Sequence, residues 1–86
     1  MILAPDLSIA YINARAERLL RISRNRLVRG MPLEDVLSIS QLEEAIISTR
    51  HQQRPQRSEW DQKGEPLEAF VLPGSDEWLL VLIQRR

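Results

Sequence analysis

The spacing of apolar residues changes near residue 52, and this change predicts the order of the elements. Before it, short apolar runs at 1–4 and 9–12 predict two strands joined by a turn at Pro5-Asp6, followed by segments with the three- and four-residue spacing of amphipathic helices. After it, residues 57–61, 67–72 and 78–83 predict three strands. Two strands, several helices and a three-strand meander indicate an α+β fold whose helices cover one face of an antiparallel sheet.

The most strongly amphipathic helix is expected from about residue 41 to residue 51. Ser40 stands where an N-cap is favoured, and Glu43 takes the capping-box position. One face carries apolar residues or threonine, and Ile47 lies off that face. The residues of this face are Leu42, Ala45, Ile46 and Thr49. Shorter helices are expected from Ala14, from Ser23 to residue 27 or 28, and over 33–37.

Asn13 stands between the second strand and the first helix. Its side-chain oxygen can accept a hydrogen bond from an otherwise unpaired amide of the first helical turn. Ala16, Leu19 and Leu20 then recur on one side of the helix. Gly30, followed by Pro32, is expected to end the next helix. The chain therefore turns from strand to helix at Asn13 without an intervening loop.

Residues 6–20 resemble the opening of a PAS domain. The resemblance rests on a turn with Asp6, an apolar strand, Asn13, small residues and an acidic-Arg-Leu-Leu helix at 17–20. It implies a five-stranded antiparallel sheet with short helices and one longer helix on one face, with residues 1–86 forming a single PAS domain cut from a longer signalling protein. The stretch at 27–30 is one residue longer than the Leu-x-Gly common in the family, which puts the short helices in doubt rather than the fold.

Charge and composition exclude several functions. The chain has 86 residues with 12 Lys and Arg against 12 Asp and Glu, so no net charge favours nucleic acid or an anionic membrane. Residues 1–30 nevertheless carry six arginines against two acidic residues, a balance of +4. This series at 15–29 is either a solvated helical face or a contact for an acidic protein surface. Its members are Arg15, Arg18, Arg21, Arg24, Arg26 and Arg29.

The sequence offers no residues for catalysis, a metal or a cofactor. It has no cysteine, which excludes disulfides and a covalent flavin adduct and fits a reducing compartment. His51 is the only histidine, and its polar neighbours favour a solvated helix end over a haem ligand. The carboxylates of Glu34-Asp35 and Glu43-Glu44 are adjacent in sequence, so on a helix they diverge and form no acid/base pair. We therefore expect no enzymatic activity of this domain and no bound cofactor. The aromatic residues Tyr11, Trp60, Phe70 and Trp78 are expected in the core or at an interface rather than around a flavin.

The resemblance is greatest to the cytoplasmic PAS domain of bacterial sensor histidine kinases. Among these kinases, it suggests the phosphate-regulon type. It implies a sensory or dimerisation input module of a two-component system, which passes a signal by protein contacts to a C-terminal kinase (a transferase) of the same chain. It also implies a cytoplasmic location, and regulatory proteins are further candidate partners. Two alternatives stay open: a PAS sensor that binds a small molecule or cofactor, and a PAS adaptor of a transcription regulator or cyclase.

The last predicted strand is apolar at every position from 78 to 83, which is typical of a strand covered on both faces. At six residues, this run is far shorter than a bilayer-spanning helix, so we expect no membrane insertion. The helices of so short a chain can cover only one face of the sheet. We therefore expect a homodimer through the other face, or a flanking helix over it. The candidate interface residues are Met1, Leu3, Phe70, Leu72, Trp78, Leu80 and Leu82.

Overall fold

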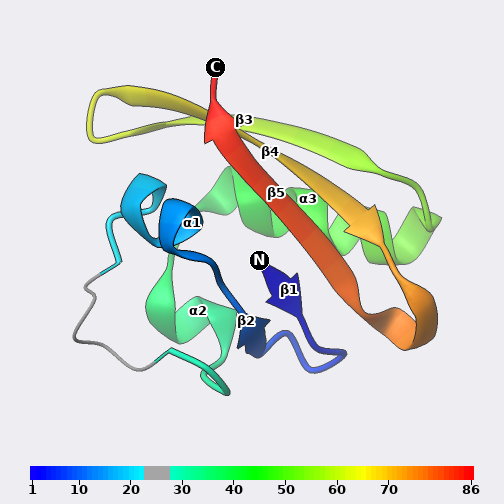
Figure 1. The fold of residues 1–86 in the computed structure, drawn as a ribbon. Helices are drawn as coiled ribbons and strands as arrows, with labels where there is room; N and C mark the ends of the chain where they lie inside the picture. The colour runs from blue at the N-terminus through cyan, green and yellow to red at the C-terminus, as the bar shows by residue number, and fades with distance from the viewer. Residues whose placement is uncertain (23–27) are drawn as a thin grey trace.

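The computed structural model describes residues 1–22 and 28–86, and its elements follow the expected order (Figure 1). Two strands come first and are followed by three helices, of which the third is the longest, and then by three longer strands. The elements are β1 (Ile2–Leu3), β2 (Ile9–Tyr11), α1 (Ala14–Leu19), α2 (Leu33–Val36), α3 (Ser40–Gln52), β3 (Gln56–Gln62), β4 (Glu65–Pro73), a 3-10 turn (Ser75–Glu77) and β5 (Leu79–Arg85).

The five strands form one antiparallel sheet in the order β2-β1-β5-β4-β3. The predicted meander is confirmed, because β3 pairs with β4 and β4 with β5 along their lengths. Lys63 and Gly64 connect β3 to β4 with φ angles of 49° and 87°. Positive φ at both central residues is what a two-residue hairpin turn requires, and glycine adopts it without steric cost.

The short strand β1 lies between β2 and β5. Ile2 is opposite Leu80 and Leu3 is opposite Leu79, while the Met1 amino group and carbonyl each bond the backbone of Val81 at 2.8 Å. On the other side, the register between β1 and β2 shifts between Ile2 and Leu3. The hairpin predicted from residues 1–4 and 9–12 is confirmed, with an irregularity that the sequence pattern did not indicate.

Helices α1 and α3 pack on one face of the sheet, here called the inner face. In Figure 1, α3 lies behind β3, β4 and β5, and α1 lies beside β5. Leu67, Val71 and Val81 turn toward the helices and are fully buried. The expected face of the longest helix is confirmed, since its four residues are buried: Leu42, Ala45, Ile46 and Thr49. The Thr49 hydroxyl donates to the Ala45 carbonyl at 2.7 Å, so its burial leaves no unpaired donor.

Asn13 caps α1 as predicted. Its backbone is extended (φ −87°, ψ 165°), and its Oδ1 accepts a hydrogen bond from the Ala16 amide at 2.9 Å. Ala16, Leu19 and Leu20 are buried in the core. The local sequence thus fixes the direction in which the chain leaves β2, and the apolar side of α1 follows from it.

One prediction about the helices is wrong, and another falls mostly outside the described residues. Ser40 is not an N-cap: it is the first helical residue of α3, Ile39 takes the N-cap position, and no side chain caps this end. The capping box with Glu43 is therefore wrong, because the helix begins one residue early. The helix expected from Ser23 lies mostly outside the described residues. Gly30 has a φ of 83°, and its amide donates to the Ile9 carbonyl at 2.8 Å, but the helix that it was expected to end lies outside the described residues.

Candidate interaction surface on the outer face of the sheet

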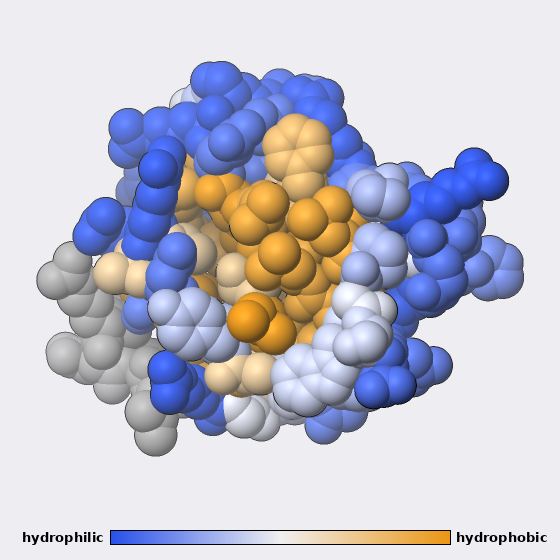
Figure 2. Space-filling model, turned by 45° about the vertical axis from the view of Figure 1, so that its right-hand side comes forward, coloured by the Kyte–Doolittle hydropathy of each residue, from blue (hydrophilic) through white to orange (hydrophobic). Residues whose placement is uncertain are grey.

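The face of the sheet turned away from the helices carries a continuous apolar area (Figure 2). Strand register produces it, because residues directly opposite one another share a face. One row crosses four strands, from Tyr11 through Ile2 and Leu80 to Leu72. The next row pairs Leu82 with Phe70. We call these residues, together with Trp78 just before β5, the outer apolar patch.

The outer apolar patch is accessible to a partner. Its most exposed members are 36–48% exposed: Ile2, Tyr11, Trp78, Leu80 and Leu82. With side chains of about 200 Å² each, they present on the order of 400 Å² of accessible surface. That equals the largest apolar patches of ordinary monomers and about half of what one partner contributes to a standard interface. Phe70 and Leu72, both half-buried, enlarge the area further.

The candidate interface residues are divided by the structure between the two faces. Phe70, Leu72, Leu80 and Leu82 lie on the outer face, as expected from their alternation. Met1 and Leu3 do not, since they are 6% and 0% exposed and belong to the core. Pairing with Val81 and Leu79, both inner-face residues, puts them there.

Sequence reasoning missed two members of the outer apolar patch, Ile2 and Tyr11. Alternation along residues 1–3 shows that Ile2 and its two neighbours lie on opposite faces, but not which of them is on the outer face. The pairing of Ile2 with Leu80 of β5 decides this. Tyr11 would share the face of buried Ile9 in a regular strand. The register shift against β1 turns it to the outer face instead, where it is 44% exposed while Ile9 is fully buried.

The other end of the outer face is charged and internally bonded. Glu68 accepts hydrogen bonds from the Arg57 guanidinium, with Nε at 3.0 Å, and from the Gln84 amide. Arg86 bonds Glu59 at 2.9 Å and Asp61 at 3.1 Å, and Arg57 also contacts Glu59. We call these six residues the carboxylate–arginine network: Arg57, Glu59, Asp61, Glu68, Gln84 and Arg86. Its polar groups are bonded within one chain, so it needs no partner charges.

Glu68 is the most protected carboxylate of this network, with 8% of its surface exposed. Hydrogen bonds from Gln84 and Arg57 stabilise its ionised form and hold the pKa of the carboxyl below its usual range. The same contact with Glu68 raises the pKa of the Arg57 guanidinium. Both members of the Arg57–Glu68 pair are therefore charged at neutral pH.

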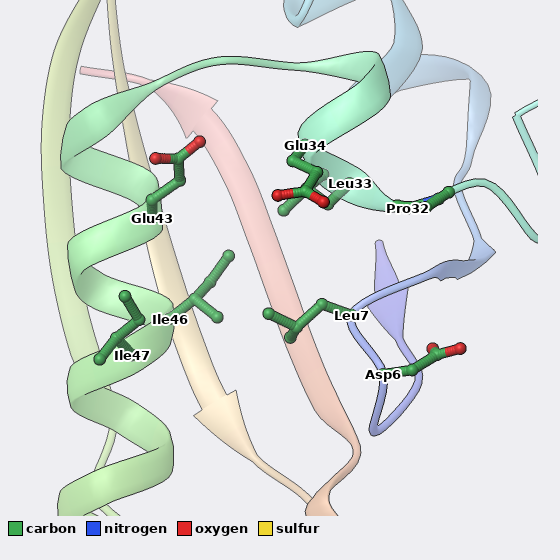
Figure 3. A pocket seen from close by; sticks show the side chains of 8 residues that line it. All are labelled: Asp6, Leu7, Pro32, Leu33, Glu34, Glu43, Ile46 and Ile47. Carbon is green, nitrogen blue, oxygen red and sulfur yellow. The ribbon is translucent and has the colours of Figure 1, made fainter.

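A cleft on the helical side is the other candidate binding site (Figure 3). Its volume is about 260 Å³, and it lies between α3, α2 and the β1–β2 turn. Ile46 and Leu7 point toward each other across it, while Glu43 and Glu34 stand on opposite walls. Asp6 is turned to its own loop, where hydrogen bonds from Ser8 lower the pKa of its carboxyl. No group of metal-binding side chains occurs within 1–22 and 28–86.

The remaining candidate residues are dispersed. His51 is exposed in the last turn of α3, as expected for a solvated helix end. Arg15, Arg18 and Arg21 are exposed on or just after α1. Arg29 lies over the ring of Tyr11 at 5.6 Å from its centre, which adds a cation–π contact beside the outer apolar patch. Arg24 and Arg26 lie outside the described residues.

No helix in the described part of the chain is long and apolar enough to cross a bilayer. Comparison of the chain with known protein families, with curated proteins and with solved structures gives no match. The site must therefore be interpreted from its own geometry, in which the outer apolar patch is the most extensive feature.

Proposed function

We propose that this chain is a PAS-type input and dimerisation module of a signalling protein, of the kind found in sensor histidine kinases. Supporting this are the order of its elements and the strand-to-helix turn at Asn13, which is where the PAS resemblance begins. The open antiparallel sheet with helices on one face is also what that resemblance implies. In this proposal the domain acts through protein contacts rather than chemistry.

The outer apolar patch is the observation that carries the proposal. Two copies related by a two-fold axis would bring the same patch together, so each copy would cover the other's Leu80 and Leu82. The carboxylate–arginine network is already bonded internally and would lie at the rim, where interfaces are polar. An apolar centre beside a rim whose charges are paired within the chain suits association with a second copy.

Strand β5 offers a route for the signal in this proposal. It contributes Leu80 and Leu82 to the patch and continues directly to Arg86. A change in how two copies pack would therefore alter the position of the strand that leads to any following segment. In a sensor kinase, that segment would connect to the kinase domain.

Sedimentation at rising protein concentration tests the proposal. We expect the wild-type domain to dimerise at micromolar concentration and Leu80→Glu to remain monomeric, because the charge would be desolvated at the centre of the contact. Ile47→Glu is the matched control: Ile47 is 65% exposed, on α3, away from the sheet. A wild-type monomer at high concentration, or equal loss of association in both variants, would contradict the proposal.

A small-molecule sensor is the second candidate function, and the cleft between α3 and α2 is the observation that favours it. Its apolar floor and its two opposed glutamates, Glu34 and Glu43, would suit a small organic cation. A volume of about 260 Å³ lies just below the usual range for ligand pockets, roughly 300 Å³ upward. Native mass spectrometry of the purified domain distinguishes this candidate, because a retained ligand adds its mass.

The residues after Arg86 in a longer chain would distinguish a kinase from a transcription regulator or cyclase.

A further inference from the structure

Strand β3 forms one border of the sheet, and its outward edge is unpaired. It is the last strand in the order β2-β1-β5-β4-β3, and Figure 1 shows it along one side of the sheet with α3 behind it. Within residues 1–22 and 28–86, only β4 pairs with it. This edge follows from the strand order, because β3 is joined to α3 before it and to β4 after it.

The register shows which backbone groups the edge presents. In an antiparallel ladder, alternate residues direct their N–H and C=O groups to opposite sides of the strand. The Pro66 carbonyl of β4 accepts a hydrogen bond from the Arg86 amide at 3.0 Å, so Pro66 faces β5. Its partner in β3, Asp61, must then face away from β4. The same holds for every second residue of β3, which gives Arg57, Glu59 and Asp61. No hydrogen bond joins these outward backbone groups to another part of the described chain.

A polar cavity of about 290 Å³ lies beside this edge, between β3 and α3. Ser58 lines it and is only 7% exposed, and its hydroxyl has no hydrogen-bond partner among the described residues. Buried hydroxyl groups are normally bonded, because losing water without gaining a partner is unfavourable. Helix α3 contributes further polar side chains to the lining: Gln41, Glu44 and Ser48. The cavity therefore contains a buried polar group that the domain alone leaves unsatisfied.

We propose that the β3 edge binds an extended polar segment of a partner protein, with a serine or threonine opposite Ser58. The segment adds to the sheet as a further antiparallel strand. Its residues opposite Arg57 and Glu59 exchange backbone hydrogen bonds with β3 and turn their side chains to the outer face. The residue between them lies opposite Ser58, so its side chain points to the inner side, where the cavity lies. Its hydroxyl then pairs with the Ser58 hydroxyl, a cross-strand contact that stabilises sheets.

The chemistry of the edge favours a polar segment over an apolar strand or a second copy. Charged side chains on an edge strand oppose pairing with apolar strands, and β3 exposes Arg57, Glu59 and Asp61. A second copy paired at this edge would bring its own α3, with exposed Gln41 and Glu44, toward the same cavity. A single extended segment leaves that space to one hydroxyl side chain.

The probe is a capped, fluorescently labelled peptide of seven residues, the length of β3, with a central threonine and no other hydroxyl group. Its binding is measured by anisotropy and compared with that of the same peptide carrying valine at the centre, which keeps the shape and removes the hydroxyl. We expect the threonine peptide to bind the wild type about tenfold more tightly, and this advantage to disappear in Ser58→Ala. Ser40→Ala is the matched control, because this exposed serine lies outside the cavity.

Thermal melts show whether Ser58→Ala acts on binding or on folding. The free variant should be at least as stable as the wild type, because the hydroxyl that it lacks has no partner there. A loss of the threonine advantage in a fully folded variant then reports the contact with the peptide. A clear fall in melting temperature would show that the fold itself uses the hydroxyl, and the proposal would lose its basis.

Two further measurements show whether the peptide adds as a strand. Methylation of the two amides opposite Arg57 and Glu59 should abolish binding, whereas methylation of the threonine amide, which points away from β3, should preserve it. In hydrogen exchange, the Arg57 and Glu59 amides should exchange fast in the free domain and become protected with peptide. All measurements use the Leu80→Glu background, so that the proposed dimer contact and this site fail independently.

Three results would overturn the proposal. The first is equal affinity of the threonine and valine peptides for the domain, and the second is equal affinity of the two methylated peptides. The third is self-association of Leu80→Glu that Ser58→Ala abolishes, because a second copy would then occupy the edge.

Discussion

Leu82 and Glu68 lie on the same face of the sheet, one row apart, yet their exposure is the reverse of what their polarity suggests. The leucine is 48% exposed and the carboxylate 8%. Glu68 is surrounded by Arg57 and Gln84, whose donors satisfy both of its oxygens. Leu82 is paired with Phe70 in the ladder, and within the described residues no strand residue pairs with it on the β1 side. At one end of the outer face the polar groups are bonded within a single chain, whereas at the other end the apolar side chains are exposed.

The difference between the two ends shows what a small sheet can satisfy alone. Charged side chains of neighbouring strands reach one another across the face, so they can close a network without a second layer. Apolar side chains gain only when something removes water from them, and here the helices occupy the other face. The open end is therefore where a partner gains most.

The largest expected effect contrasts two neighbouring residues of β5. Val81 is fully buried on the inner face and Leu80 is 38% exposed on the outer face. Val81→Glu should unfold most of the domain, because an unpaired buried charge costs about 3–5 kcal/mol. Leu80→Glu should keep a melting temperature close to that of the wild-type monomer.

Thermal melts followed by circular dichroism at low protein concentration measure this contrast. Val81→Ala serves as a milder variant, which should fold with a lowered melting temperature because it leaves a cavity. If Leu80→Glu unfolds as readily as Val81→Glu, the assignment of inner and outer faces is wrong.

A smaller effect on stability is expected at the starts of two helices, because the Asn13 side chain caps α1 and the Ser40 side chain does not cap α3. Asn13 caps α1, so Asn13→Ala should cost about 1 kcal/mol and lower the melting temperature by roughly 4–8 °C in a domain of this size. Asn13→Asp should be tolerated. Ser40 caps nothing and is exposed, so Ser40→Ala should change stability by less than about 0.5 kcal/mol. Urea titrations of the three variants give these values, and equal losses at Asn13 and Ser40 would contradict the assignment.

Local patterns predicted most of the elements. The cap at Asn13 and the buried face of α3 depend on residues close in sequence, and both are confirmed. The start of α3 shows the limit of such reasoning, because Ser40 can act equally as a cap or as a first helical residue.

The composition of the outer apolar patch depends on pairing between distant residues. Alternation within β5 grouped Leu80 with Leu82 correctly, but it could not show that Ile2, rather than Met1 or Leu3, pairs beside them. Tyr11 reaches the patch through a register shift that no local signal marks. The buried position of Glu68 likewise requires Arg57 and Gln84 from two other strands.

The smallest expected effect concerns the closed end of the outer face and depends on pH. Hydrogen bonds hold the pKa of Glu68 below its unfolded value, which is about 4.3 for a glutamate. The ionised carboxylate therefore stabilises the fold fully above that unfolded pKa, and the contribution is lost as the pH falls through the lower, folded pKa. Glu68→Gln retains the size of the side chain and removes this titration.

Melting temperatures of the wild type and Glu68→Gln should thus differ at pH 7 and converge as the pH falls through the lowered, folded pKa, because the protonated wild-type carboxyl then resembles the amide. Glu44→Gln is the control, an exposed carboxylate on α3. A Leu80→Glu background keeps the domain monomeric, so that the measurement reports the network and not the dimer. A constant difference between wild type and Glu68→Gln across this range would mean that the carboxylate is held by its shape and not by its charge, and the closed end would then owe its stability to packing.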